Sequence, residues 1–160
     1  MTAPSPLHDR LIQFLRDQNA TIREVQHAPT FTSEESALAR GEPLGCGAKA
    51  LLLKTDEEFR LFVLPADRQL DSAGVKRALE LRRLRFASPE ELLELTGLVP
   101  GSVPPFGEPL LPFRLYADVE VGTRFPQLAF NAGSLTPSVI MPATDWDRLA
   151  KPIRLKLTKV

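Results

Sequence analysis

The sequence predicts a compact single α+β domain over residues 1–160, with a mixed, mostly antiparallel, curved sheet and helices packed on its faces. First, segments with helical and with strand periodicity are short and interleaved along the chain. Second, one pair of apolar segments is separated by a few polar residues, as in a hairpin, whereas other pairs are separated by helices. Third, 15 prolines are spread over 160 residues without a repeat, which indicates many loops.

The N-terminal part is expected to form two helices and a strand. Residues 5–19 have one apolar face, which predicts an amphipathic helix. A strand is expected over residues 21–26. Thr32 and Glu35 then have the spacing of a capping box, so a short helix begins there and ends before Gly41.

A β-hairpin is expected at the centre of the sheet. It consists of the apolar run 49–54 and the run 60–64, joined by four polar residues. A helix over 70–81 and a short strand over 84–87 follow. The sequence Ser-Pro-Glu-Glu that starts at residue 88 begins a further helix, because it supplies an N-cap, a first-turn proline and two first-turn acids.

The last third combines strands with one helix. The helix is expected to begin at Thr144 or Asp145 and to include Trp146. A terminal strand is expected over residues 153–157. Three earlier strands are expected near residues 113–118, 128–131 and 138–141.

Charge and cysteine content limit the classes of partner. Twenty basic and twenty acidic residues give no net charge, so contact with RNA requires a local patch or a partner protein. The basic residues between Lys76 and Arg85 either form such a patch or belong to a solvated face. A lone Cys46 excludes an internal disulfide, and no apolar run is long enough for a membrane span. Residues 2–10 do not resemble a secretory signal, and a cytoplasmic protein is expected, with neither membrane nor DNA as a partner.

Several kinds of chemistry lack their motifs. One cysteine and two histidines, His8 and His27, match no metal-binding spacing, and there is no P-loop, dinucleotide fingerprint or nucleophile elbow. An enzyme with this sequence is therefore expected to use no metal, no cofactor and no side-chain nucleophile.

The stretch 101–107, Gly-Ser-Val-Pro-Pro-Phe-Gly, is the first candidate site. Prolines stiffen its middle and glycines free its ends, so neither a helix nor a central strand can contain it. Such loops can direct backbone N–H groups toward an oxygen-rich ligand. The alternative is a simple connector between a helix and a strand.

Three side chains are further candidates. Lys49 begins an apolar run, so its ammonium either contacts a phosphate or carbonyl oxygen or lies at a sheet edge in water. His27, before Pro29, either contacts a ligand or hydrogen-bonds a turn. Cys46, between glycines, could act as a nucleophile, but a lone loop cysteine usually does not.

Five motifs in one order resemble the YbaK/ProX family of aminoacyl-tRNA deacylases, relatives of the editing domain of bacterial prolyl-tRNA synthetases. The resemblance extends from about residue 22 to 150. The motifs are His-Ala-Pro-Thr-Phe-Thr-Ser-Glu-Glu at 27–35, Gly-Ala-Lys-Ala-Leu-Leu-Leu-Lys at 47–54, Leu-Arg-Phe-Ala-Ser-Pro-Glu-Glu-Leu at 84–92, the loop at 101–107, and Asn-Ala-Gly-Ser at 131–134.

The resemblance implies a trans-editing hydrolase that removes a wrong amino acid from the 3′-terminal adenosine of a tRNA and that can act alongside an aminoacyl-tRNA synthetase. It implies that Lys49 holds the substrate and that backbone N–H groups of Gly101 to Pro105 stabilise the carbonyl oxygen while water attacks. Lys49, Gly101 and Ser102 are thereby the catalytic residues. The substrate-binding residues implied are His27, Thr30, Ala50, Val103, Pro104, Pro105, Phe106, Asn131, Gly133 and Ser134.

Two positions differ from the alanine-specific branch of that family. That branch has asparagine after the strand lysine, where this chain has Ala50, and histidine in the turn where this chain has Phe130, Asn131 and Ala132. Alanine, serine, cysteine and threonine all remain candidates, with proline tRNA the leading acceptor. Asn131 is expected to bind the α-amino group or a side-chain hydroxyl, or else to shape the turn beside Gly133.

Two other functions remain open from the sequence. One is an inert module that binds the tRNA 3′ end within a synthetase complex. The other is a hydrolase or regulatory domain for a small aminoacyl-like metabolite. Release of amino acid, and its dependence on the tRNA body, would separate them.

Overall fold

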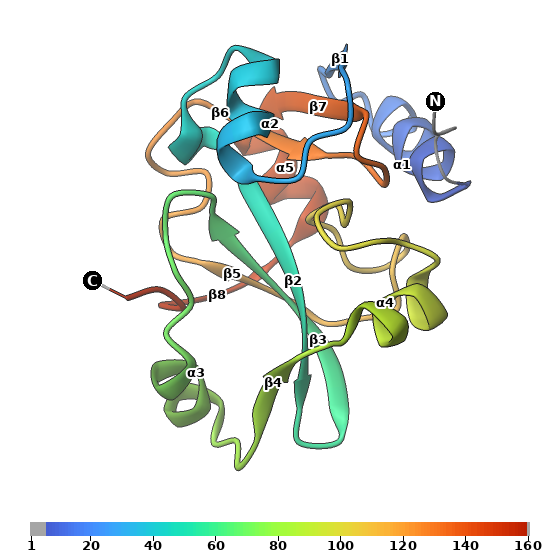
Figure 1. The fold of residues 1–160 in the computed structure, drawn as a ribbon. Coiled ribbons are helices and arrows are strands. Elements are labelled where there is room, and N and C mark those ends of the chain that lie inside the picture. The colour runs from blue at the N-terminus through green and yellow to red at the C-terminus, as the bar shows by residue number, and fades with distance from the viewer. Residues whose placement is uncertain (1–5, 160) are drawn as a thin grey trace.

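The computed structural model describes residues 6–159, in which helices and strands alternate along the chain (Figure 1). No helix in this part of the chain is long and apolar enough to cross a membrane. The helices are α1 (Pro6–Asp17), α2 (Ser33–Arg40), α3 (Ser72–Leu79), α4 (Pro89–Thr96), α5 (Ala143–Ala150) and a 3-10 turn η1 (Leu44–Cys46). The strands are β1 (Arg23–Gln26), β2 (Ala48–Thr55), β3 (Glu58–Pro65), β4 (Leu84–Phe86), β5 (Leu115–Asp118), β6 (Gln127–Asn131), β7 (Pro137–Pro142) and β8 (Ile153–Leu155).

The strands form two sheets rather than the single sheet expected from the sequence. One has the order β4-β2-β3-β5-β8 and the other the order β1-β7-β6. The pairs β3–β5 and β5–β8 are parallel, and the remaining pairs are antiparallel, so the mixed and mostly antiparallel character is confirmed. A bridge between Gly47 and Ala129 connects the sheets. The start of β2 therefore lies beside β6.

The β2–β3 hairpin occupies the interior of the larger sheet, as predicted. Its register pairs Lys49 with Leu64 and Thr55 with Glu58. The turn places Asp56 at φ +54°, and the Asp56 carboxylate accepts hydrogen bonds from the amides of Arg82 and Arg83. These bonds hold the loop before β4 against the hairpin.

The predicted N-caps of α2 and α4 are present. Thr32 accepts a hydrogen bond from the Glu35 amide, and Ser88 and Glu91 form a reciprocal capping box. The predicted helix over 70–81 is shorter, because Asp71 caps its start and Glu80 ends it in the left-handed conformation.

The start of α5 differs from the prediction. The helix begins at Ala143, directly after Pro142, and no side chain caps it. Thr144 and Asp145, the two residues expected to open the helix, both lie within it, and Asp145 instead accepts a hydrogen bond from the Thr21 amide at 3.2 Å. Residue 5, the expected start of the first helix, lies outside the described residues, and α1 begins at Pro6.

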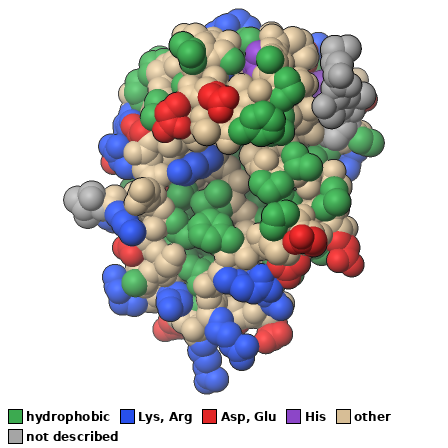
Figure 2. Space-filling view, in the orientation of Figure 1, with side chains coloured by type: hydrophobic (Ala, Val, Ile, Leu, Met, Phe, Trp, Pro, Cys, Tyr) green, Lys and Arg blue, Asp and Glu red, His purple; other side chains and the backbone are tan. Residues whose placement is uncertain are grey.

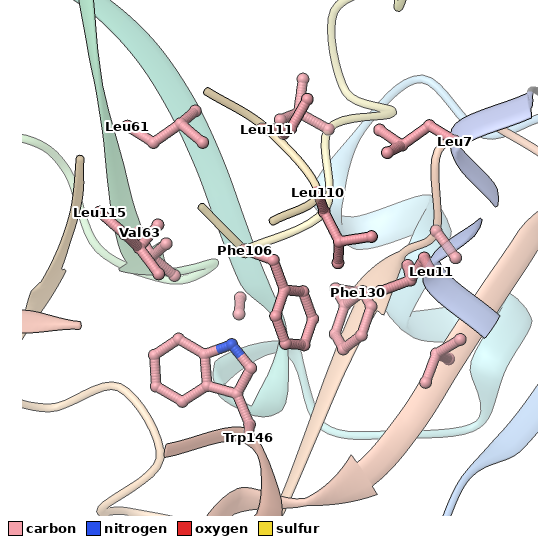
Figure 3. Packing of buried hydrophobic residues seen from close by; sticks show 14 of the residues in the cluster. Leu7, Leu11, Leu61, Val63, Phe106, Leu110, Leu111, Leu115, Phe130 and Trp146 are labelled. Atoms are coloured by element: carbon pink, nitrogen blue, oxygen red, sulfur yellow. The ribbon is translucent and has the colours of Figure 1, made fainter. Parts of the chain in front are cut away.

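The main core fixes the position of the 101–107 loop. Phe106 is buried and packs edge-to-face against Phe130, with ring centroids 5.7 Å apart (Figure 3). Trp146 of α5, shown in the same figure, is also buried and donates its indole N–H to the Pro105 carbonyl at 2.9 Å. The C-terminal half of the loop is therefore held in the core. Its first residues, Gly101 and Val103, line a cavity instead.

Candidate functional site

A cavity of about 660 Å³ opens beside α2, the start of β2 and the beginning of the 101–107 loop. Figure 2 shows this face of the molecule, which is hollowed beneath α2, with hydrophobic side chains in the hollow. The described residues that line it are Thr30, Phe31, Thr32, Ser33, Ser36, Arg40, Gly47, Ala48, Lys49, Ala50, Leu51, Ala66, Val99, Pro100, Gly101, Val103, Asn131 and Leu135. The lining contains two cations and no carboxylate, so it favours a ligand with anionic or carbonyl oxygens.

The cavity brings together six of the residues predicted from the sequence. They come from four separate segments of the chain, and they are Thr30, Lys49, Ala50, Gly101, Val103 and Asn131. The other predicted residues are not part of its lining: His27, Ser102, Pro104, Pro105, Phe106, Gly133 and Ser134.

Lys49 lies half-buried near the start of β2. Desolvation lowers its pKa from 10.5, while the more distant charges of Glu34 and Asp67 act in the opposite direction. Its ammonium forms no ion pair with any described residue. A partly desolvated cation without a bound carboxylate is available to a ligand in the cavity.

The loop at 101–103 has two amide donors that remain free. The Ser102 amide donates to the Val99 carbonyl at 3.1 Å, and the Ser102 hydroxyl also closes this turn by donating to the same carbonyl at 2.7 Å. The amides of Gly101 and Val103 have no hydrogen-bond partner among the described residues. These two N–H groups, rather than that of Ser102, are the donors that a bound oxygen can use.

Two buried hydroxyls form part of the wall. Thr30 and Ser36 lie 2.7 Å apart through their Oγ1 and Oγ atoms, and both side chains are buried. Since one hydroxyl of such a pair donates to the other, the second retains its own hydrogen. The wall can therefore donate one hydrogen bond to a ligand.

His27 and Ser134 take part in hydrogen bonds outside the cavity. Nδ1 of His27 lies 2.8 Å from the Ala28 carbonyl, which can only accept, so this nitrogen has the proton. Nε2 lies 2.8 Å from the hydroxyl of Ser138. The Ser134 hydroxyl is buried 3.3 Å from that of Thr136. His27 thus hydrogen-bonds a turn, the alternative that the sequence left open.

Cys46 is the last residue of η1; it is buried and does not line the cavity. Its thiol donates to the Gln127 carbonyl, and burial raises its pKa above 9.0. A protonated, buried thiol is a poor nucleophile. Within residues 6–159, no group of three or more His, Cys, Asp and Glu side chains is arranged to hold a metal ion.

Twelve of the 18 lining residues were not among the predicted site residues, and two of them, Phe31 and Arg40, have large side chains at the cavity. Phe31 is 78% exposed at the cavity, and Arg40 lies half-buried in its wall at the end of α2. Phe31 could have been noticed as an aromatic residue in the loop that enters α2. Arg40 has no local signal, because its neighbours in space come from strands about 90 residues later in the chain.

The model of the aminoacyl-tRNA editing domain matches residues 27–149. The chain belongs to this family. It is 40% identical over 157 residues to the multifunctional Ser/Thr-tRNA deacylase ProXp-y of Escherichia coli K12, covering 95% of this chain and 93% of the relative. It is also 37% identical over 94 residues to a proline–tRNA ligase of Bacillus licheniformis, covering 56% of this chain and 16% of the ligase.

A solved structure supports the fold. A crystal structure described as that of a candidate trans-editing enzyme for prolyl-tRNA synthetase aligns with a TM-score of 0.83 and 26% identity, covering 99% of this chain and all of the other. The family resemblance and the α+β fold expected from the sequence are both confirmed by these comparisons.

Proposed function

We propose that this member of the editing-domain family is a free-standing deacylase of mischarged aminoacyl-tRNA, acting on a small amino acid attached to proline tRNA or a related tRNA. The observation that carries the proposal is the meeting of Lys49 and the two free amides of Gly101 and Val103 in one cavity. The similarity over 95% of the chain to a Ser/Thr-tRNA deacylase supports this reaction class.

In the proposed reaction, water adds to the carbonyl carbon of the aminoacyl ester. The Gly101 and Val103 amides donate to the carbonyl oxygen as it becomes negative, and Lys49 adds a positive charge near the ester or the terminal phosphate. The bond between the carbonyl carbon and the ribose oxygen then breaks, and that oxygen takes a proton, assisted by the neighbouring ribose hydroxyl. The products are the free amino acid and the uncharged tRNA.

The cavity favours an amino acid with a hydroxyl group. The Thr30–Ser36 pair offers one hydrogen to a ligand, and both residues belong to the lining. Editing sites select partly by size, and a hydrogen bond to the side chain adds discrimination that size alone does not give. Serine and threonine are therefore the leading substrates of the four candidates, in keeping with the name of the E. coli relative.

The partners proposed are the 3′-terminal adenosine of an aminoacyl-tRNA and, in addition, an aminoacyl-tRNA synthetase. The similarity to a segment of a proline–tRNA ligase is consistent with such an association. Phe31, exposed at the cavity, is placed to stack against a base of the tRNA end.

The test is amino-acid release from preformed tRNAs. Proline tRNA charged with alanine, serine, cysteine or threonine is compared with each amino acid on its own tRNA. Release of serine or threonine, faster than the uncatalysed reaction and dependent on the tRNA body, is expected. Binding of the charged tRNA with protection of its ester would instead identify an inert binding module, and equal release from a minimal aminoacyl-adenosine would indicate a metabolite hydrolase.

A further inference from the structure

Arg40 is a cation in the cavity wall that contacts only neutral groups among the described residues. Its Nε donates to the Ser138 hydroxyl at 2.9 Å, and its Nη2 donates to Oδ1 of Asn131 at 3.0 Å. Burial lowers the pKa of Arg40 to about 10, so the guanidinium is still charged at neutral pH. A desolvated cation without a bound carboxylate is costly to the fold, so a contribution to stability does not account for it.

Asn131 connects this arginine to the 101–107 loop. It lies opposite Ser138 in the β6–β7 register; its Oδ1 accepts a hydrogen bond from Arg40 and lies 3.2 Å from the Ser138 hydroxyl. Its Nδ2 donates to the Gly101 carbonyl at 2.7 Å. The guanidinium of Arg40 therefore orients Oδ1 of Asn131, and the Gly101 carbonyl orients its Nδ2, so both ends of the Asn131 amide are held.

The peptide group between Gly101 and Ser102 is held at both ends. Its carbonyl, that of Gly101, accepts a hydrogen bond from Nδ2 of Asn131. Its N–H, that of Ser102, donates a hydrogen bond to the Val99 carbonyl. The next carbonyl, that of Ser102, accepts from the Gly133 amide at 2.9 Å. A trans peptide is planar, with C=O and N–H on opposite sides, so fixing these carbonyls also fixes the direction of the Val103 amide.

Gly101 is the flexible point of this arrangement. Its φ of +86° is a conformation that glycine can leave readily, since it has no Cβ to restrict it. The bond from Asn131 is a side-chain contact that restrains this residue from outside the loop.

We propose that Arg40 and Asn131 form a positioning relay, in which the guanidinium orients the Asn131 amide and the Asn131 amide fixes the Gly101–Ser102 peptide that lies between the two free donor amides. The inference rests on the proposed function, because those amides matter only if they bind the reacting carbonyl oxygen. Arg40 is a positioning residue in this scheme and acts through Asn131.

A double-mutant cycle tests the relay. Single-turnover deacylation is measured for the wild type, Arg40→Met, Asn131→Ala and the double variant, with the rate at saturation and the half-saturating concentration determined separately. Each single variant is expected to lower the saturated rate about 10-fold to 100-fold, with little change in half-saturation, since misplacement of a catalytic group acts on this scale. The double variant is expected to be no slower than the slower single variant.

The controls separate the relay from general damage. Arg23→Met removes a nearby arginine that pairs with Glu42 at 2.6 Å, and its rate should equal that of the wild type. Arg40→Lys keeps the charge but loses the planar fork, so it should also lower the rate. If Arg40→Met fails to fold, the cycle is run with Arg40→Lys.

Each outcome decides the matter. An active wild type whose rate is unchanged in Arg40→Met or Asn131→Ala would overturn the relay alone. Losses in rate that multiply in the double variant would also overturn the relay, because Arg40 would then act independently of Asn131. A variant in which only the half-saturating concentration changes would overturn it too, because Arg40 would then bind the substrate directly. A wild type that releases no amino acid from any charged tRNA would overturn the proposed function and the relay with it.

Discussion

Replacing Lys49 with methionine removes one charge from the cavity while keeping a side chain of similar length. Lys49 lies half-buried in the lining and forms no ion pair with a described residue. Its ammonium is therefore available to a ligand in the cavity. The variant should lose activity and keep its fold.

The size of the loss follows from the electrostatics. Two unit charges 4 Å apart interact by about 4 kcal/mol at an effective dielectric constant near 20, which suits a partly buried site. Partial exposure reduces this to about 3 kcal/mol, similar to the value of one oxyanion donor. At 1.36 kcal/mol for each factor of ten, Lys49→Met should slow deacylation about 100-fold.

Although Lys49→Met should lower the activity, it should not lower the free energy of unfolding. The folded-state pKa of Lys49 lies below its unfolded value, so the folded state binds this proton less tightly and is penalised below the lowered pKa. The penalty is relieved as pH rises through the lowered pKa toward 10.5. At pH 7, Lys49→Met should therefore melt at the same temperature as the wild type or at a higher one.

The assay is single-turnover release of serine from charged tRNA, alongside thermal unfolding. Lys54→Met is the matched control, because Lys54 belongs to the same strand but lies over the ring of Phe59, at 5.8 Å, and does not line the cavity. A Lys49→Met variant as active as this control would refute the assigned role. A large fall in melting temperature would refute the electrostatic reasoning.

Two further variants probe the cavity and the thiol. Thr30→Val combined with Ser36→Ala removes both hydroxyls of the pair, and should reduce the preference for serine over alanine about 3-fold to 10-fold, the effect of one hydrogen bond. Competition between the two charged tRNAs measures this preference, and an unchanged ratio would exclude the hydroxyl pair from recognition. Cys46→Ser should deacylate at the wild-type rate, because the protonated thiol lies outside the cavity lining. A much slower variant with an unchanged melting temperature would indicate a thiol mechanism.

Local chemistry made much of this fold predictable. The hairpin followed from two apolar runs separated by polar residues, and the caps at Thr32 and Ser88 followed from side chains that bond amides three residues away. The same kind of reasoning made Lys49 a candidate, since a lysine at the start of an apolar strand lies near the core, but its role in the reaction is implied only by the family resemblance. The family motifs identified the other segments around the cavity.

Contacts between residues far apart in the sequence could not be predicted from local sequence patterns. Asp145 has the local signature of a helix start, yet its carboxylate bonds the amide of Thr21, 124 residues earlier. Arg40 contacts Asn131, which is 91 residues later. The division into two sheets depends on pairing of β1 with β7 across most of the chain. Each of these depends on which segments meet, which neither periodicity nor capping specifies.

The most direct test is a structure of the protein with a non-hydrolysable aminoacyl-adenosine, in which an amide replaces the 3′ ester. The amino acid should lie in the cavity, with its carbonyl oxygen within hydrogen-bond distance of the Gly101 or Val103 amide and its ribose near Lys49. An analogue bound elsewhere, or bound with its carbonyl oxygen turned away from both amides, would contradict the proposed site.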